Sequence, residues 1–180
     1  MAVPTQCLIE QCAIADPASA WSLFLGWTSA AITGLVAVLV AWLLVWPSAL
    51  SFMVAVGYGL SVVLNVLLKV IIQQDRPHPG GECGAGFGMP SGHVQHATYV
   101  FVTLLLVAVQ RMARWIRVSG AGLTVWRTAL VAVTGAALLV FVGISRVQLQ
   151  YHTAAQVLVA YVVGAMWALT WALLWLQMQW

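Results

Sequence analysis

Residues 49–72 read ALSFMVAVGYGLSVVLNVLLKVII, an almost unbroken apolar run in which Lys69 is the single charged side chain. An α-helix needs about 20 apolar residues to cross the hydrocarbon core of a bilayer, so this run predicts a membrane-spanning helix. The whole chain has the same character, because 63% of its 180 residues are hydrophobic and 6% are charged. Soluble domains carry about 25% charged residues, and disordered chains have low hydrophobicity. Both classes are therefore excluded.

Four further stretches are long and apolar enough to span a bilayer, at about residues 22–46, 92–110, 126–144 and 154–175. We therefore expect an all-α integral membrane bundle of about five helices. Only Pro47 and Ser48 separate the first two stretches, which predicts an antiparallel helical hairpin. The segment 73–90 holds three Pro and five Gly without a hydrophobic run, and this composition is typical of a loop.

Charged residues indicate how the bundle is oriented. Arg111, Arg114, Arg117 and Arg127 flank the connection between the third and fourth stretches, and the positive-inside rule places that connection in the cytoplasm. Alternation then places residues 1–21, the 73–90 loop and the 145–151 turn on the opposite side. Residues 1–20 contain no Lys or Arg, unlike the start of a cleaved signal peptide, so we expect the 22–46 stretch to remain a span. Residues 22–180 form the predicted membrane domain.

Three basic residues lie on the non-cytoplasmic side against the general trend: Lys69, Arg76 and Arg146. Taken singly, Lys69 is typical of a side chain that snorkels to the interface, and Arg146 of an interface anchor. Lys69 and Arg76 would share one helix face if the helix continued as far as Arg76. Three cations without matching acids repel one another in a medium of low dielectric, and an anionic ligand such as phosphate relieves that repulsion.

Two histidines accompany these cations. In the segment GMPSGH at residues 88–93, we expect Ser91 to cap a helix whose free N–H groups attract an oxyanion beside His93. The turn before the last stretch supplies His152 close to Arg146. Asp75 and Glu82 are isolated carboxylates, which disfavours a metal-dependent phosphatase. We therefore expect neither a metal nor another cofactor.

These residues form three ordered blocks: Lys69-x6-Arg76-Pro77, Pro90-Ser91-Gly92-His93 and Ser145-Arg146-x5-His152. Together they resemble the three-part signature of the type 2 phosphatidic acid phosphatase (PAP2) superfamily. The resemblance implies a metal-independent phosphohydrolase in which His152 attacks phosphorus and His93 protonates the leaving oxygen before activating water. It implies that the phosphoryl oxygens are bound by Lys69, Arg76 and Arg146, with help from Ser91 and the backbone N–H of Gly92.

The chain departs from the superfamily pattern at Gln156, where an Asp usually follows the nucleophilic histidine by four residues. Gln156 lies one helical turn from His152, so its oxygen is able to accept a hydrogen bond from the imidazole and fix the tautomer. It cannot stabilise an imidazolium by charge. We expect a weaker nucleophile or a compensating acid, for which Asp75 is the candidate.

The strings around His93 and His152, together with Gln156, look like the dolichyl diphosphatase branch of the superfamily. This resemblance implies the conversion of dolichyl diphosphate to dolichyl phosphate, which recycles the lipid carrier of N-glycosylation. It also implies a multi-pass protein of the endoplasmic reticulum membrane with its site facing the lumen. The expected partners are a polyisoprenyl diphosphate lipid and the membrane. Seven basic residues are too few for a nucleic-acid-binding face.

Two alternatives stay open at this point. One is a phosphatase for phosphatidate, a sphingoid-base phosphate or undecaprenyl diphosphate. The other is a catalytically weak relative that binds lipid, for which Gln156 is the best support. Outside the three blocks, we expect His96 to be a polar residue at the mouth of the cavity. Cys83 is able to pair with Cys7 or Cys12 in an oxidising compartment, and the sequence does not choose between them.

Overall fold

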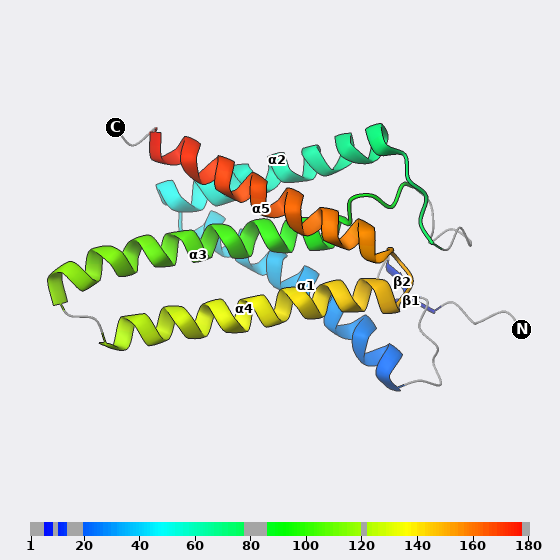
Figure 1. Ribbon diagram of the computed structural model, residues 1–180, viewed down its shortest axis with the longest axis horizontal. Coiled ribbons are helices and arrows are strands. Elements are labelled where there is room, and N and C mark those ends of the chain that lie inside the picture. Colours follow the sequence, from blue (N-terminus) through cyan, green and yellow to red (C-terminus); the bar gives the residue numbers. More distant parts are fainter. Residues whose placement is uncertain (1–5, 9–10, 14–19, 78–85, 120–121, 178–180) are drawn as a thin grey trace, which may run out of the picture.

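The computed structural model describes residues 6–8, 11–13, 20–77, 86–119 and 122–177 (Figure 1). The chain begins with a short antiparallel hairpin, β1 (Gln6–Leu8) and β2 (Gln11–Ala13), in which Cys7 and Cys12 are register partners. Five long helices follow: α1 (Ala20–Val45), α2 (Ala49–Ile72), α3 (Gly92–Ser119), α4 (Gly122–Gln148) and α5 (Ala154–Gln177). The expected pairing of Cys83 lies outside the described residues.

Each predicted span is a helix, and the fold is the expected α-helical membrane bundle. In the described part of the chain, four segments are long and apolar enough to cross a membrane: Ala49–Ile72, Gly92–Ala113, Val125–Gln148 and Ala154–Trp175. Within α1, the segment that meets the same apolar criterion is the shorter Val36–Val45. The helices α3 and α4 extend beyond the predicted spans, so Arg111 and Arg127 lie on helices close to a short connection rather than in a long loop.

Local signals explain both ends of α2. Ser48 and Ser51 form a reciprocal capping box, which starts the helix directly after Pro47. Gln73 adopts a left-handed conformation with φ 50°, and its N–H bonds to the carbonyl of Lys69, which ends the helix. Arg76 therefore lies in the loop after α2. The condition for Lys69 and Arg76 to share one helix face, a helix that continues as far as Arg76, is not met, because the left-handed residue ends the helix between them.

The helix α3 occupies the centre of the bundle, where it packs most extensively against α5 and also contacts α4, α2 and α1 (Figure 1). Close approach of α3 and α5 requires Gly164, because a Cβ at this position would lie 2.5 Å from the carbonyl oxygen of Gln95. The indoles of Trp167 and Trp171 on α5 donate to the carbonyls of Gly57 and Met53 on α2, at 2.9 and 2.8 Å. These bonds satisfy polar groups that lipid cannot hydrate.

The outer surface of the helices is apolar, as expected for a bundle in lipid. Phe52, Ile71, Leu130 and Leu158, on three different helices, are each more than 60% exposed. Buried positions, by contrast, include many polar side chains, among them Ser61, Asn65, Gln95, Arg146, His152 and Gln156. The bundle therefore places its polar groups inside, and most of those just named lie near one end.

Candidate functional site

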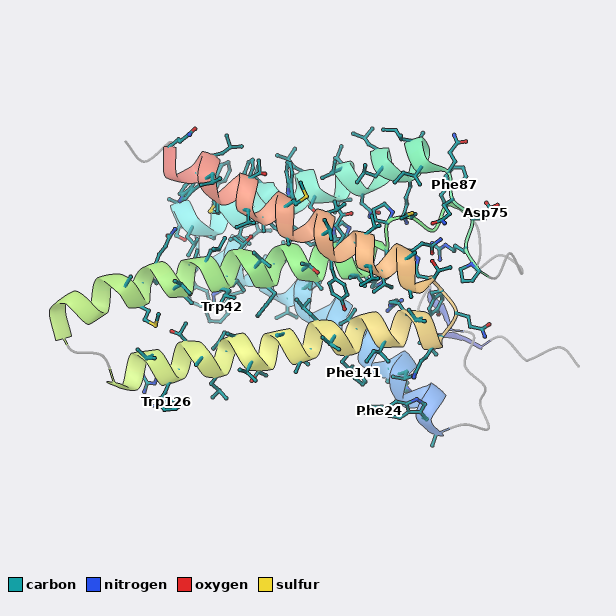
Figure 2. The ribbon with its side chains drawn as sticks, in the orientation of Figure 1. Phe24, Trp42, Asp75, Phe87, Trp126 and Phe141 are labelled. Carbon is teal, nitrogen blue, oxygen red and sulfur yellow. The ribbon has the colours of Figure 1, made fainter. Side chains whose placement is uncertain are left out.

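The sequence-predicted site residues come from four places in the chain that meet at one end of the bundle. These places are the end of α2 with the loop after it, the start of α3, the end of α4, and the turn before α5 with the first turn of that helix. Figure 2 shows Asp75 and Phe87 at this end, whereas Trp126 lies at the opposite end. Alternating helix directions produce this convergence, because the chain enters or leaves each of these helices at the same end.

A tight turn brings Arg146 and His152 together. The main-chain N–H groups of Tyr151 and His152 both donate to the carbonyl of Arg146, at 3.1 and 3.2 Å. Gln150 makes this turn possible by adopting a left-handed conformation with φ 57°. Arg146 and His152 are 3% and 4% exposed, so an ionisable pair is withdrawn from solvent at the mouth of the bundle.

Gln156 fixes the orientation of the His152 ring. Its Nε2 donates to the carbonyl of Asp75 at 2.9 Å, and its Oε1 accepts the N–H of Thr153 at 3.2 Å. These two main-chain partners determine which end of the amide is oxygen. Oε1 also lies 3.2 Å from Nδ1 of His152, so Nδ1 carries the proton and donates. The lone pair of His152 is therefore on Nε2.

The same side chain holds the loop after α2 against the site. Besides the bond to Asp75, Nε2 of Gln156 donates to the side-chain oxygen of Gln74 at 3.2 Å. Gly88 packs directly on the amide, where a Cβ would lie 2.6 Å from Nε2. Asp75 thus contacts Gln156 through its main chain, while the residue itself is exposed. Among the described residues, no contact joins the carboxylate of Asp75 to His152. The expectation that Asp75 compensates for the missing acid is therefore not supported by a contact.

The charges of three basic residues act on His152. Burial lowers the pKa of His152 to about 4, and the positive charges of Arg76, Lys69 and Arg146 contribute in the same direction against a smaller opposing effect of the Gln156 hydrogen bond. Burial also lowers the pKa of Arg76. At neutral pH the imidazole of His152 is therefore uncharged and its Nε2 is available as a nucleophile.

The two arginines have unused hydrogen-bonding capacity. Arg146 packs its guanidinium 5.2 Å from the centre of the Tyr151 ring. Its Nε and Nη2 atoms are buried and have no hydrogen-bond partner in the part of the chain that the structure describes, and the same is true of Nε in Arg76. Buried donors normally have partners, so these atoms point to a ligand with acceptor oxygens.

The start of α3 contributes Ser91, Gly92 and His93. The main-chain N–H of Ser91 donates to the carbonyl of Gln156 at 3.3 Å, which ties this segment to α5. Ser91 occupies the predicted N-cap position, directly before α3, and its carbonyl accepts the N–H of Gln95 at 3.0 Å. Its hydroxyl makes no capping bond, because it is buried and lacks a partner among the described residues. His93 is half-buried and interacts electrostatically with Arg146 and His152. The structure thus brings together all the residues of the three predicted blocks to which a role was given.

Sequence reasoning missed a buried amide network beneath this segment. Asn65 donates through Nδ2 to the carbonyl of Pro90 at 3.3 Å and to Oε1 of Gln95 at 2.9 Å. Gln95 in turn donates to the carbonyl of Ser61 at 3.1 Å. The signal was present in the sequence, because polar side chains inside an apolar span are costly unless they have a function.

The expectation of a metal-independent site stays a prediction. Across the described ranges, no group of three or more His, Cys, Asp or Glu side chains is arranged to hold a metal ion. His78 and Glu82 lie outside the described residues.

Known proteins resemble the chain in sequence. The PAP2 superfamily profile matches residues 50–180. Dolichyldiphosphatase 1 of Homo sapiens is 34% identical over 117 residues, which is 64% of this chain and 48% of the relative. Dolichyldiphosphatase of Saccharomyces cerevisiae is 30% identical over 133 residues, 70% of this chain and 52% of the relative. Lipid phosphate phosphatase epsilon 1, chloroplastic, of Arabidopsis thaliana is 30% identical over 112 residues, 62% of this chain and 36% of the relative.

A solved structure resembles the fold. The transmembrane PAP2 type phosphatidylglycerolphosphate phosphatase of Bacillus subtilis superposes with a TM-score of 0.66 at 20% identity, over 86% of this chain and 76% of that one. The chain spans about half the length of the dolichyldiphosphatases it matches. The family profile covers well over half of the chain, including all three blocks that converge at the site. The chain is therefore a multi-pass membrane protein that belongs to the PAP2 superfamily.

Proposed function

We propose that this protein is a metal-independent phosphohydrolase of a polyisoprenyl diphosphate lipid, with dolichyl diphosphate as the substrate and dolichyl phosphate and phosphate as the products. One observation carries the proposal. Arg146 and Arg76 carry buried guanidinium donors without partners among the described residues, and their charges act on His152, whose lone pair is on Nε2. A phosphoryl group supplies the negative charge and the acceptor oxygens that such a cluster lacks.

The proposed reaction has two displacements at the terminal phosphorus. Nε2 of His152 forms a bond to phosphorus while the bond to the bridging oxygen breaks, and His93 in its imidazolium form gives a proton to that departing oxygen and becomes neutral. Water then attacks the phosphohistidine, with His93 taking a proton from the water and His152 leaving. Splitting one hydrolysis into two steps in this way is covalent catalysis.

Charge neutralisation is the main contribution of the remaining residues. We assign the binding of phosphoryl oxygens to Lys69, Arg76 and Arg146, with Ser91 and the N–H of Gly92. Phosphoryl transfer depends mostly on positioning and on stabilising the charge spread over the equatorial oxygens. Three fixed cations in a buried site meet that requirement with protein groups. The free hydroxyl of Ser91 adds a further donor at the start of α3.

The substrate class rests on the relatives. Those named dolichyldiphosphatase match this chain over 117 to 133 residues, at 30–36% identity. Gln156 supports the same branch by resemblance, because it takes the position at which most of the superfamily has Asp and the dolichyl diphosphatase branch has Gln. We accordingly propose a role in recycling the lipid carrier of N-glycosylation, in the endoplasmic reticulum membrane with the site facing the lumen. The clustering of arginines near the other end of the bundle supports that orientation.

A lipid monophosphate phosphatase is the second candidate. The similarity to lipid phosphate phosphatase epsilon 1 favours it. The two candidates share the phosphoryl site and differ in the leaving group, which is a lipid phosphate in one case and an alcohol in the other.

Phosphate release from the purified chain in detergent with EDTA distinguishes the two candidates. Dolichyl diphosphate, dolichyl phosphate and phosphatidate are compared at equal surface concentration. We expect the diphosphate to have the highest kcat/KM, and faster hydrolysis of phosphatidate would reject the proposed substrate. His152→Ala and His93→Ala are expected to abolish release, while Gly59→Ala is the control, because a Cβ at Gly59 meets nothing within 4 Å.

A further inference from the structure

His96 lies one helical turn below the start of α3, and the reaction above does not use it. Its Nδ1 is 3.3 Å from the hydroxyl oxygen of Ser61 on α2. The ring of Tyr58 covers one side of the imidazole, with 5.4 Å between the ring centres. An ionisable side chain within a membrane span is costly, and such residues usually serve a site.

The amide network determines which nitrogen of His96 carries the proton. Asn65 donates through Nδ2 to the main-chain carbonyl of Pro90, which fixes the orientation of the Asn65 amide. The same Nδ2 donates to Oε1 of Gln95, which fixes the orientation of the Gln95 amide. Gln95 therefore donates through Nε2 to the carbonyl and to the hydroxyl oxygen of Ser61, at 3.1 and 3.3 Å.

The Ser61 hydroxyl completes this chain of donors. It accepts from Gln95, and the residue is fully buried, so its own proton needs an acceptor. Nδ1 of His96 is the acceptor within reach among the described residues. The proton of the His96 ring is then on Nε2. That atom lies on the side of Gly92, where a Cβ would be 3.7 Å from it, and faces the start of α3.

The N–H on Nε2 of His96 therefore points toward the part of the site to which Lys69 contributes positive charge. Lys69 lies one helical turn after Asn65 on α2, and Asn65 contacts Pro90, so the two residues share the face of α2 that is turned toward the start of α3. The charge of Lys69 acts on both His93 and His96. In an in-line displacement the leaving group departs on the side opposite the nucleophile. With His152 on one side of phosphorus, the leaving phosphate of a diphosphate would lie on the His93 side, toward His96.

We propose that His96 and Lys69 form a second phosphate subsite, which binds the phosphate that stays on the lipid and so selects diphosphate over monophosphate substrates. His96 contributes a neutral N–H donor, oriented by Ser61 and Gln95. Lys69, whose charge acts on His152, His93 and His96, contributes charge to both the transferred and the leaving phosphate. The subsite deepens the proposed function and rests on it for the identity of the natural ligand. Binding of a small diphosphate analogue tests it without any need for turnover.

The probes are methylenediphosphonate, whose bridge cannot be hydrolysed, and inorganic phosphate, with dissociation constants measured by calorimetry on the full chain in detergent. We expect the wild type to bind the diphosphonate more tightly. A hydrogen bond to a charged group is stronger than one between neutral groups, so His96→Ala is expected to weaken diphosphonate binding about tenfold and phosphate binding less than twofold. His96→Gln retains a donor at a similar reach and is expected to restore most of the affinity.

Tyr58→Phe is the matched control, because it keeps the ring against His96, and it is expected to leave both constants unchanged. An equal loss for both probes in His96→Ala would overturn the subsite, and so would no loss for either. Retained phosphate binding shows that the variant is folded. If the wild type binds the diphosphonate selectively but fails to hydrolyse dolichyl diphosphate, the proposed function is wrong and the subsite stands.

Discussion

Gln156 donates a 2.9 Å hydrogen bond to the main-chain carbonyl of Asp75 while its oxygen lies 3.2 Å from Nδ1 of His152. One amide therefore connects the proposed nucleophile on one side of the site to the loop that carries Arg76 on the other. A carboxylate accepts hydrogen bonds and does not donate them when ionised. Gln156 accordingly performs a task that an Asp or Glu at this position would not.

Replacing Gln156 by Glu separates its two roles, which are to orient His152 and to hold the loop that carries Arg76. The variant keeps an acceptor for Nδ1 but loses both donors and places a negative charge beside the carbonyl of Asp75. We expect kcat/KM to fall about tenfold, with the loss mostly in KM because the loop that carries Arg76 is released. Steady-state kinetics on dolichyl diphosphate measure this split.

Gln156→Leu is the companion variant, since it removes the acceptor as well. It is expected to lose kcat in addition, because the His152 tautomer is no longer fixed. Equal activity of Gln156→Glu and the wild type would show that the contact with the loop has no role in substrate binding.

Gly88 provides a steric test of the same contact. An Ala at this position would bring Cβ to 2.6 Å from Nε2 and 2.7 Å from Oε1 of Gln156, so the amide must move. Overpacking of this kind costs about 1–3 kcal/mol of stability, and we expect activity to fall by at least tenfold. Activity and melting temperature are measured beside Gly59→Ala, which has open space. A Gly88→Ala variant as active as the control contradicts the prediction.

The pH dependence of kcat/KM is expected to have its acid limb near pH 4. His152 has a pKa lowered to about 4 by burial and by the nearby cations, so the nucleophile stays unprotonated above that pH and is lost below it. Arg76→Gln removes one of these positive charges and should raise the pKa of His152, which moves the limb to higher pH. Profiles of both proteins between pH 3.5 and 8 measure the shift. A wild-type limb near the ordinary histidine value of about 6.5 would contradict the assignment.

Arg146 is expected to decrease stability in the absence of ligand. Its buried Nε and Nη2 have no partners among the described residues, and burying a charge without partners is unfavourable. Arg146→Met should therefore raise the melting temperature while abolishing hydrolysis. Orthovanadate, a phosphate analogue, should raise the melting temperature of the wild type and not that of the variant. Stabilisation of both proteins to the same extent would show that the anion binds elsewhere.

Much of the fold could be predicted from the sequence, because each helix is an apolar run and each break has a local signal. Pro47 and Ser48 mark the α1–α2 turn, and the Gly- and Pro-rich segment marks the loop before α3. The left-handed conformations of Gln73 and Gln150 could not be predicted, since neither is a glycine. They decide that Arg76 leaves the helix and that His152 folds back onto Arg146.

The candidate site could likewise be predicted only in part. Its residues could be named from the three blocks and their topology, but their contacts depend on tertiary structure. The bond from Gln156 to Asp75 joins residues 81 positions apart, and the free hydroxyl of Ser91 departs from the usual behaviour of serine before a helix. The Ser61–Asn65–Gln95 network likewise becomes visible when α2 and α3 pack together.

Trapping the phosphoenzyme tests the central mechanistic proposal most directly. Purified chain is mixed with dolichyl diphosphate, quenched at alkaline pH and digested, and the peptide that carries an acid-labile phosphate is identified by mass spectrometry. We predict phosphate on His152 in the wild type and no label in His152→Ala. A phosphate on another residue, or substrate turnover in His152→Ala, would contradict the assignment of His152 as the nucleophile.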